Sequence, residues 1–352
     1  MDKICFGGNL ALKIDVSKAF DTLDWSFLLK VLHGFGFNNT FCNWIHTILK
    51  SAMMSISING MQNGYFSCKR GVRQGDPLPP LLFCLAEEAL SRGISKLVTD
   101  GEVDLISSSR GTKVPSHCFY VDDLMVFCKG KVSNLVALKN LFTRYANSSR
   151  QVINASKSFF FDGGVNQNRI DHIINVIGFN VGTLPFNYLG TPIFIGKPKV
   201  SHFQSIADKV KNKLATWKAS LLSMAGRVQM VKVVIRNILF HTMSIYSWPV
   251  SLIKELEKWI RNFIWNGDIN KRKMVTVSWK KVCTSYEEGG LGIKSLISLN
   301  NATNLKLCLA LFNSDEHTIS SKFTLVKKFI THTNQNLHKH NVPIQSKIVI
   351  TR

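Results

Sequence analysis

The sequence predicts an α+β fold in which a part with both strands and helices precedes a mostly helical, basic part. Two observations lead to this prediction. The first 196 residues contain short apolar runs bounded by turn residues, and these alternate with segments whose apolar residues recur at helical spacing. From Lys197 to Lys281 the pattern is helical and rich in Lys and Arg. The 352 residues, 45% of them hydrophobic, exceed the usual size of one domain.

The first part opens with a strand and two capped helices. Residues 9–16 (NLALKIDV) form a short apolar run, which predicts a buried strand with Asp15 at its C-terminal end. Asp24 is a favourable N-cap, and apolar residues follow it at helical spacing. Asn39 or Thr40 can cap a second helix with the same spacing.

Turn residues next predict a hairpin and the start of a helix. Asn59-Gly60 and Asn63-Gly64 lie between the runs MMSISI and GYFSCKR, a pattern typical of a β-hairpin. The segment from Pro77 to Pro80 opens a helix that continues through Leu90.

A second hairpin carries adjacent aspartates. The apolar runs 117–121 and 124–128 flank Asp122-Asp123, which predicts a tight turn with both carboxylates at its tip. Two carboxylates at one tip repel each other, and a bound cation would offset that repulsion. The remaining predicted elements of this part are a helix at 132–147, a strand at 158–161 and a helix at 168–177.

The charge of the chain points to a polyanionic partner. Lys plus Arg number 44 against 22 Asp plus Glu, a formal net charge of +22. Such an excess attracts nucleic acid and makes its binding salt-dependent, although a basic surface without a partner is the alternative. The basic residues concentrate in segment 197–281 beside four tryptophans, and the tryptophans at helical spacing are expected in the core.

The sequence also bears on localisation. None of the eight cysteines forms a CxxC pair, so neither a zinc knuckle nor a disulfide framework is indicated. We find no signal peptide and no membrane-spanning segment, and we expect a soluble intracellular protein in the nucleus or the cytoplasm. His338 and His340 have no further metal ligand nearby in the sequence, and the polar tail 313–352 carries no motif.

Seven motifs, in order, resemble those of the reverse transcriptases of plant LINE-type (non-LTR) retrotransposons. They are LKIDVSKAFDTLDW, GVRQGDPLPPLLFCLAEEAL, FYVDDLMVF, QVINASKS, FNYLGTPIFIG, WKASLLSMAGRVQMVKVVI and EEGGLGIKSL. The resemblance implies a right-hand polymerase palm, an antiparallel sheet with helices on one face, followed by a mostly helical thumb. It implies domains at 1–196 (palm) and 197–312 (thumb and distal connection).

The resemblance also implies an RNA-directed DNA polymerase with two-metal nucleotidyl transfer to a primer 3′-hydroxyl. Two Mg²⁺ ions, with Mn²⁺ as an alternative, would serve an RNA template, a DNA primer and deoxynucleoside triphosphates. The residues with implied roles fall into four groups. They are the metal ligands Asp15, Val16 (by its carbonyl), Asp122 and Asp123; the general acid Lys157; the nucleotide-binding Phe20, Arg73, Gln74 and Gly75; and the primer-binding Tyr188, Leu189 and Gly190.

The sequence departs from the family pattern at several places. Pro79 stands where Ser is more common, Val121 where Ala is usual and Arg150 where Gly is common. The chain begins 14 residues before Asp15, so we expect it to lack the fingers region and the endonuclease, and to extend a primer poorly. Three hypotheses therefore stay open: an active polymerase, a catalytically dead retrotransposon relic, and a nucleic-acid-binding accessory protein.

Overall fold

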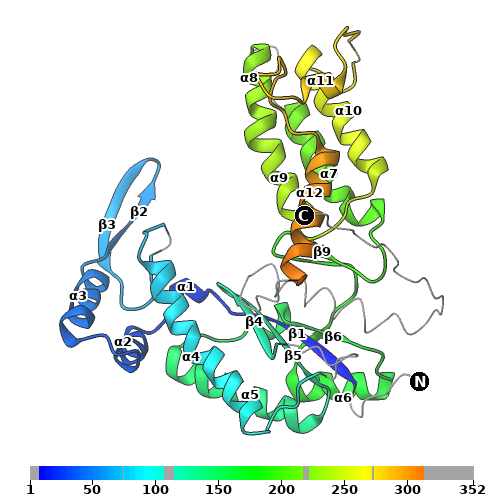
Figure 1. The fold of residues 1–352 in the computed structure, drawn as a ribbon. Helices are drawn as coiled ribbons and strands as arrows, with labels where there is room; N and C mark the ends of the chain where they lie inside the picture. The colour runs from blue at the N-terminus through cyan, green and yellow to red at the C-terminus, as the bar shows by residue number, and fades with distance from the viewer. Residues whose placement is uncertain (1–7, 74, 107–114, 217–221, 272, 313–352) are drawn as a thin grey trace. The chain divides into compact units, whose positions relative to one another are not determined.

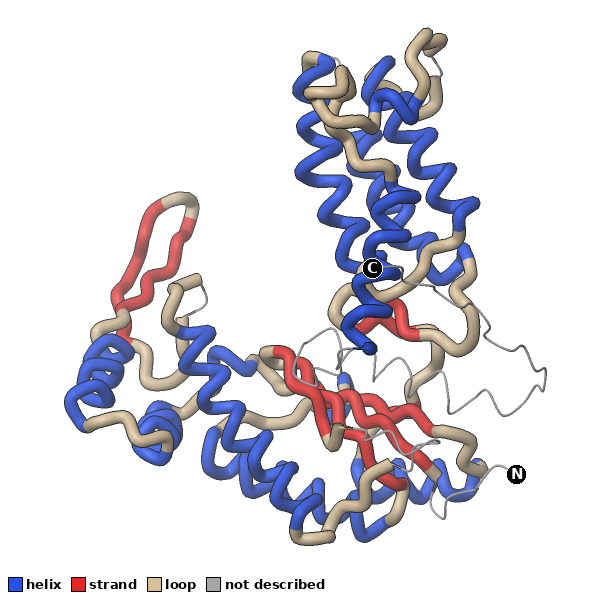
Figure 2. The backbone as a smooth tube through the Cα atoms, viewed as in Figure 1, coloured by secondary structure: helices blue, strands red, loops and turns tan. Residues whose placement is uncertain are grey.

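The computed structural model describes residues 8–73, 75–106, 115–216, 222–271 and 273–312. The chain divides into two compact units, Met1–Thr183 and Leu184–Arg352. Strands and helices mix in the first unit, whereas helices dominate the second (Figures 1 and 2). The α+β class expected from the sequence is confirmed.

The first unit is built on a five-stranded sheet with β1 at its centre. The strands, in their order across the sheet, are β4 (His117–Tyr120), β5 (Asp123–Lys129), β1 (Asn9–Asp15), β6 (Phe159–Asp162) and β7 (Asn180–Val181). The pairs are antiparallel except for β6 with β7, which is parallel. As the sequence predicts, β1 ends on Asp15.

Three helices share one core with the sheet. They are α4 (Pro79–Thr99), α5 (Val132–Ser149) and α6 (Gln167–Ile177). Alternate residues of β1 and β5, among them Leu12 and Val126, are fully or almost fully buried against these helices. Strand residues two apart lie on the same face of a sheet, so this face alone contributes to the core that the helices cover.

A second core forms around the helices that precede α4. These are α1 (Ala19–Thr22), α2 (Trp25–Gly34) and α3 (Asn39–Lys50), which pack with the start of α4. Asp24 caps α2 as predicted, because its Oδ1 accepts from the amide of Phe27 at 3.0 Å. The cap predicted at Asn39 or Thr40 is wrong by one residue: Asn38 has extended backbone, and its Oδ1 accepts from the amide of Phe41 at 2.8 Å.

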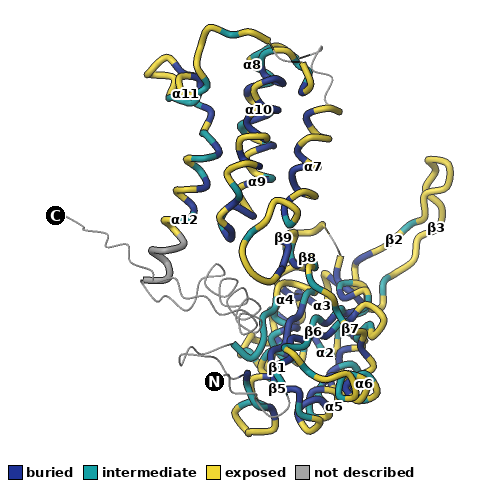
Figure 3. The backbone as a smooth tube through the Cα atoms, turned by 90° about the vertical axis from the view of Figure 1, so that its right-hand side faces the viewer, coloured by how far each residue is buried: buried dark blue, intermediate teal, exposed yellow. Residues whose placement is uncertain are grey.

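The predicted hairpin is present as β2 (Met53–Ile58) and β3 (Met61–Ser67). Asn59 and Gly60 form its turn with φ of 51° and 82°. Asn63 and Gly64 are not a turn but lie within β3, where the register shifts. Both strands are exposed along almost their entire length (Figure 3).

Gly71 lies against the backbone of α1 in a conformation that favours glycine. Its φ is +80°, and a Cβ there would lie 2.6 Å from the carbonyl oxygen of Asp21. Its amide donates to Leu23 at 2.8 Å, and its carbonyl accepts from the Trp25 indole at 2.7 Å. These bonds hold the backbone of residue 71 in place, so a small backbone shift cannot relieve the clash between an added Cβ and the Asp21 carbonyl oxygen.

We therefore expect Gly71→Ala to lower the free energy of unfolding by about 2–4 kcal/mol, from the left-handed φ and from overpacking together. Urea unfolding of both proteins measures this difference. Gly36→Ala is the control, because Gly36 has φ +87° but no heavy atom within 4 Å of its Cβ position. An equal loss in both variants would show that the contact with Asp21 contributes nothing.

The second unit combines a short hairpin with a helical bundle. Its elements are β8 (Phe186–Tyr188), β9 (Thr191–Ile193), α7 (Val200–Thr216), α8 (Met224–Met230), a π-helical turn (Val231–Ile235), α9 (Arg236–Met243), α10 (Val250–Asn266), α11 (Trp279–Val282) and α12 (Leu296–Phe312). None of the described helices in either unit has the length and apolar character that crossing a bilayer requires.

The hairpin β8–β9 belongs with these helices. The Tyr246 hydroxyl donates to the Pro192 carbonyl at 2.8 Å, and His241 Nε2 lies 3.0 Å from the Leu189 carbonyl oxygen. The division between the units consequently falls before this hairpin, whereas the sequence places the boundary near residue 196. Trp248 and Trp259 are buried as expected, and Trp217 lies outside the described residues.

Candidate active site

The aspartates lie where the central strands end. The turn between β4 and β5 consists of Val121 and Asp122, and Val121 has φ 54°. Asp123 is the first residue of β5 and pairs directly opposite Asp15 across the sheet. The prediction of two carboxylates at the tip is therefore correct only for Asp122, since Asp123 is part of the ladder.

A pocket of about 330 Å³ opens beside these strand ends. It brings together residues that are far apart in the sequence. The lining residues are Asp15, Val16, Ser17, Lys18, Ala19, Phe20, Asp122, Asn154 and Lys157. Asp15 and Asp122 thus line one cavity together with Val16.

The loop that follows Asp15 is held by the segment after α5. The Asn154 amide donates to the Asp15 carbonyl at 2.8 Å, and the Asp15 amide donates to Ser158 Oγ at 3.1 Å. The Ser17 amide donates to the Val152 carbonyl at 2.9 Å. These bonds fix the backbone on both sides of Asp15.

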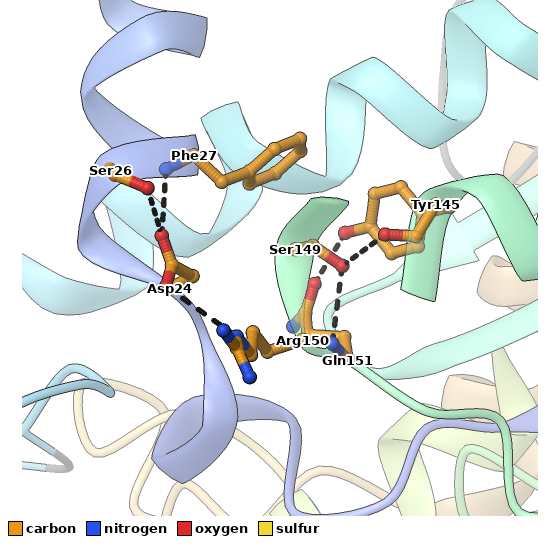
Figure 4. Close-up of polar contacts among 7 residues, drawn as sticks. All are labelled: Asp24, Ser26, Phe27, Tyr145, Ser149, Arg150 and Gln151. Atoms are coloured by element: carbon orange, nitrogen blue, oxygen red, sulfur yellow. Dashed lines mark hydrogen bonds and ion pairs between the residues drawn. The ribbon is translucent and has the colours of Figure 1, made fainter. Parts of the chain in front are cut away.

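The same segment also anchors the far end of the loop. The Asp24 amide donates to the Ser149 carbonyl at 3.0 Å, and Arg150 lies 3.9 Å from the Asp24 carboxylate (Figure 4). Residues 149–158 therefore support the entire stretch from Asp15 to Asp24. Asn154, which lines the pocket, and Ser158 were not singled out as site residues from the sequence, although both lie in the QVINASKS motif.

The three departures from the family pattern have clear structural settings. Arg150 ends α5 with φ 63°, the left-handed conformation that glycine adopts without cost, which accounts for the usual Gly. Val121 is likewise left-handed, an uncommon state for a β-branched residue. Pro79 is the first residue of α4, a position that suits its fixed φ.

Phe20 and Lys157 both reach the pocket. Phe20 stacks on Phe83 with the ring centroids 4.3 Å apart, so it is at once a pocket residue and part of the core around α2. Lys157 ends a short 3₁₀ helix (Ala155–Lys157) whose N-cap is Asn154. Its side chain is exposed at the pocket wall.

The other nucleotide-binding residues implied by the resemblance are placed differently. Arg73 Nη2 lies 3.4 Å from the Met53 carbonyl oxygen and does not line the pocket. Gly75, with φ +105°, does not line it either. Gln74 lies outside the described residues.

Tyr188, Leu189 and Gly190 belong to the second unit. Leu189 and Gly190 form the β8–β9 turn with φ of 50° and 74°. Tyr188 precedes them and is 1% exposed. The motif therefore forms a tight turn on the helical unit.

The electrostatics of the strand ends are those of clustered carboxylates. Burial raises the pKa of Asp123, Lys13 opposes this shift, and Asp122 and Asp15 add to it. Within the described part of the chain, no three His, Cys, Asp or Glu side chains are arranged as a metal-binding group. Substrate oxygens would have to complete the shell of a cation held here.

Glu87 on α4 is a buried carboxyl behind the site. Burial raises its pKa to about 7, with Tyr145 and Gln151 opposing the shift and Asp122 adding to it. The unfolded chain loses this proton near pH 4.5, and the folded protein keeps it until about pH 7. The free energy of unfolding should therefore fall as pH rises through this window.

We expect this fall to reach about 3 kcal/mol for Glu87 alone. Urea unfolding at several pH values, for the wild type and Glu87→Gln, isolates this contribution because other groups cancel in the difference. The wild type should lose stability relative to Glu87→Gln between pH 4.5 and pH 7. A constant difference across that window would mean that Glu87 ionises normally.

Comparison with known proteins decides the family. The family model described as reverse transcriptase (RNA-dependent DNA polymerase) matches residues 7–193, which is more than half of the chain. The chain belongs to this family. The matched region contains all three aspartates and every pocket residue.

Its relatives include proteins of retrotransposons. A 149 kDa protein of transposon TX1 from Xenopus laevis is 26% identical over 260 residues, which cover 73% of this chain and 19% of that protein. The Pol polyprotein of the type-2 retrotransposable element R2DM from Drosophila melanogaster is 24% identical over 317 residues, 86% of this chain and 28% of that protein. The chain thus spans less than a third of either relative.

Among solved structures, telomerase of Candida albicans in complex with a fragment of telomeric RNA covers 92% of this chain with a TM-score of 0.44 and 12% identity. The match spans 49% of that chain. The prediction of a reverse transcriptase of the non-LTR retrotransposon kind is confirmed by the family match and the relatives, whereas its plant type stays a prediction.

Proposed function

We propose that this chain carries the polymerase site of a retrotransposon reverse transcriptase, an RNA-directed DNA polymerase that adds nucleotides to a primer 3′-hydroxyl. One observation carries the proposal: Asp15 and Asp122 line a single pocket at adjacent strand ends in a member of the family. In-line transfer of a nucleotidyl group needs a cluster of negative oxygens that holds divalent cations against substrate phosphates. This pocket supplies such a cluster.

The donor set fits Mg²⁺, with Mn²⁺ as the alternative. Mg²⁺ prefers hard oxygen ligands and takes one or two protein carboxylates together with substrate phosphates and water. Asp15, Asp122 and the Val16 carbonyl would hold the ions, and Asp123 would be the third carboxylate. When bound, two ions lower the pKa of the attacking hydroxyl and offset the charge on the leaving pyrophosphate.

The remaining pocket residues would position the nucleotide. Phe20, held on Phe83, is suited to lie beneath the sugar and exclude a ribose 2′-hydroxyl. Lys157 would give a proton to the pyrophosphate leaving group as a general acid. Arg73, Gln74 and Gly75 would contact nucleotide and template.

The second unit would hold the primer and the duplex. Tyr188, Leu189 and Gly190 would support the primer end, and the basic helices of segment 197–281 would contact phosphates as a thumb. The first unit would serve as the palm. Its partners would then be an RNA template, a DNA primer and deoxynucleoside triphosphates.

Primer extension on an RNA template tests the proposal. The assay uses the chain alone and the chain joined behind the region that precedes the matched segment in the Drosophila relative. We expect Mg²⁺-dependent extension, weak for the chain alone and stronger for the joined form, and Asp122→Asn should abolish it in both. If neither form extends a primer although the first unit is folded, the chain is a relic or only binds nucleic acid.

A further inference from the structure

A series of hydrogen-bonded, buried polar groups runs from α4 to the loop that lines the pocket. Glu87, Tyr145 and Gln151 are 4%, 7% and 1% exposed. The Tyr145 hydroxyl oxygen lies 3.1 Å from Glu87 Oε1 and also bonds to Gln151 Oε1. The Gln151 amide nitrogen donates to the Ala19 carbonyl at 3.1 Å. None of these three side chains lines the pocket, although Glu87 and Gln151 lie within the second and fourth of the seven motifs.

The number of available hydrogens determines which group donates and which accepts in each of these contacts. Gln151 donates to Ala19 through its amide nitrogen, so only its carbonyl oxygen faces Tyr145. The tyrosine hydroxyl carries one hydrogen and cannot donate to both Gln151 and Glu87. If the hydroxyl donates to Gln151, the contact with Glu87 needs a hydrogen from the carboxyl group. Glu87 then donates to Tyr145, and each contact has one donor and one acceptor.

The rest of the Glu87 environment agrees with a neutral acid. Its Oε2 is buried without a hydrogen-bond partner in the described structure. A buried carbonyl oxygen without a partner costs far less than a buried charge in the same state. Asp122, an acidic neighbour of Glu87, also disfavours the ionised form. No described basic side chain forms a salt bridge with Glu87.

The hydrogen bond from Gln151 to Ala19 connects this series of polar groups to the pocket. Ala19 lies between Lys18 and Phe20, and all three line the pocket. The series of polar groups fixes the Ala19 carbonyl. The Phe20 carbonyl accepts separately from the backbone amide of Val72 at 2.7 Å. Ser149 reinforces the connection, because its Oγ accepts from the backbone N–H of Gln151 and donates to the backbone carbonyl of Tyr145 (Figure 4).

We propose that Glu87, as a neutral carboxylic acid, is a positioning residue that acts through Tyr145 and Gln151 to fix the pocket loop from Val16 to Phe20. The proposal rests on the proposed function only for its effect on nucleotide addition. The loop itself is a property of the fold. Losing the hydrogen bonds of this series should release the Ala19 carbonyl and let Phe20 and the residues after Asp15 move.

Hydrogen exchange on the full chain tests the positioning directly. Tyr145→Phe and Glu87→Leu should speed exchange of the amides of residues 17–22 at least tenfold. Glu87→Gln should leave it within about twofold, because its amide group can donate to Tyr145 as the neutral acid does. The matched control is Leu138→Val on α5, a core residue 1% exposed whose apolar side chain forms no hydrogen bond with the series of polar groups.

Two results would overturn the proposal. One is exchange in Tyr145→Phe that stays at the wild-type rate at residues 17–22, or that rises no more there than in Leu138→Val. The other is exchange in Glu87→Gln as fast as in Glu87→Leu, which would mean that Glu87 acts as a charge or only by its packing.

Steady-state primer extension supplies the second readout. We expect Tyr145→Phe and Glu87→Leu to lower kcat/KM for the nucleotide about 10- to 100-fold, with Glu87→Gln near wild type. A Glu87→Gln protein as impaired as Glu87→Leu contradicts the positioning role. A wild-type protein without activity contradicts the proposed function instead, and the exchange experiment still decides whether Glu87 fixes the loop.

Discussion

Asp15→Asn and Asp122→Asn should each lower the rate of primer extension at least about 1,000-fold. Each substitution removes one negative charge from the pocket and leaves its size almost unchanged. A single preorganised group at the site of charge development contributes about 10²–10³ in rate, and a metal ligand should contribute at least as much. Single-turnover extension with saturating Mg²⁺ measures the loss.

The design includes a graded series and a control. Asp123→Asn should cost less than Asp122→Asn, because Asp123 pairs within the sheet and does not line the pocket. Asp100→Asn, at an exposed turn after α4, should leave the rate unchanged. Hybrid binding should be unaffected in all four variants. If Asp15→Asn retained more than a tenth of the activity, this pocket would not be the reaction centre.

Affinity for an RNA–DNA hybrid should fall at least about 100-fold between 50 and 200 mM salt. The chain carries a net charge of +22, and each phosphate contact releases a condensed counterion. Six to ten contacts would give a loss of about 10³–10⁵ over this range, so 100-fold is a lower bound. Fluorescence anisotropy at several salt concentrations gives the slope.

Paired variants locate the contacts. Lys209 and Lys213 lie four residues apart on α7 and are both exposed. Replacing both by Gln should reduce the slope of log affinity against log salt by about two. Lys96→Gln on α4 of the first unit is the control and should leave the slope unchanged. An affinity independent of salt would show that the basic helices contact no phosphates.

The sequence predicted local structure correctly where the pattern allows a single interpretation. Asp24 before an apolar helical pattern predicted a cap, and the cap is present. Asp123 was misplaced because hairpin turns are read from composition, whereas register depends on the partner strand. The cap at Asn38 was missed because Asn39 and Thr40 are equally good caps in isolation, and only the backbone conformation distinguishes them.

The supporting groups of the site were beyond the reach of such patterns. Gln151 contacts Ala19 across 132 positions of sequence, and Tyr145 contacts Glu87 across 58. No periodicity links residues at those separations. The motifs contain the residues that line the pocket, and they also contain Glu87 and Gln151. A buried Glu or Gln within a motif, or a Tyr within an amphipathic helix, has no signature that marks it as a support.

The central position of β1 determines the order in which the site can assemble during synthesis. Leu12 pairs with Val126 on one side and with Phe160 on the other, so the strand that carries Asp15 lacks at least one of its two neighbours until β6 is available. At about 5–20 residues per second, translation from β1 to the end of β6 takes roughly 7–30 seconds. During that interval at least one edge of this apolar strand has no partner strand. Strand β1 therefore completes its pairing only after the last residue of β6 has been added.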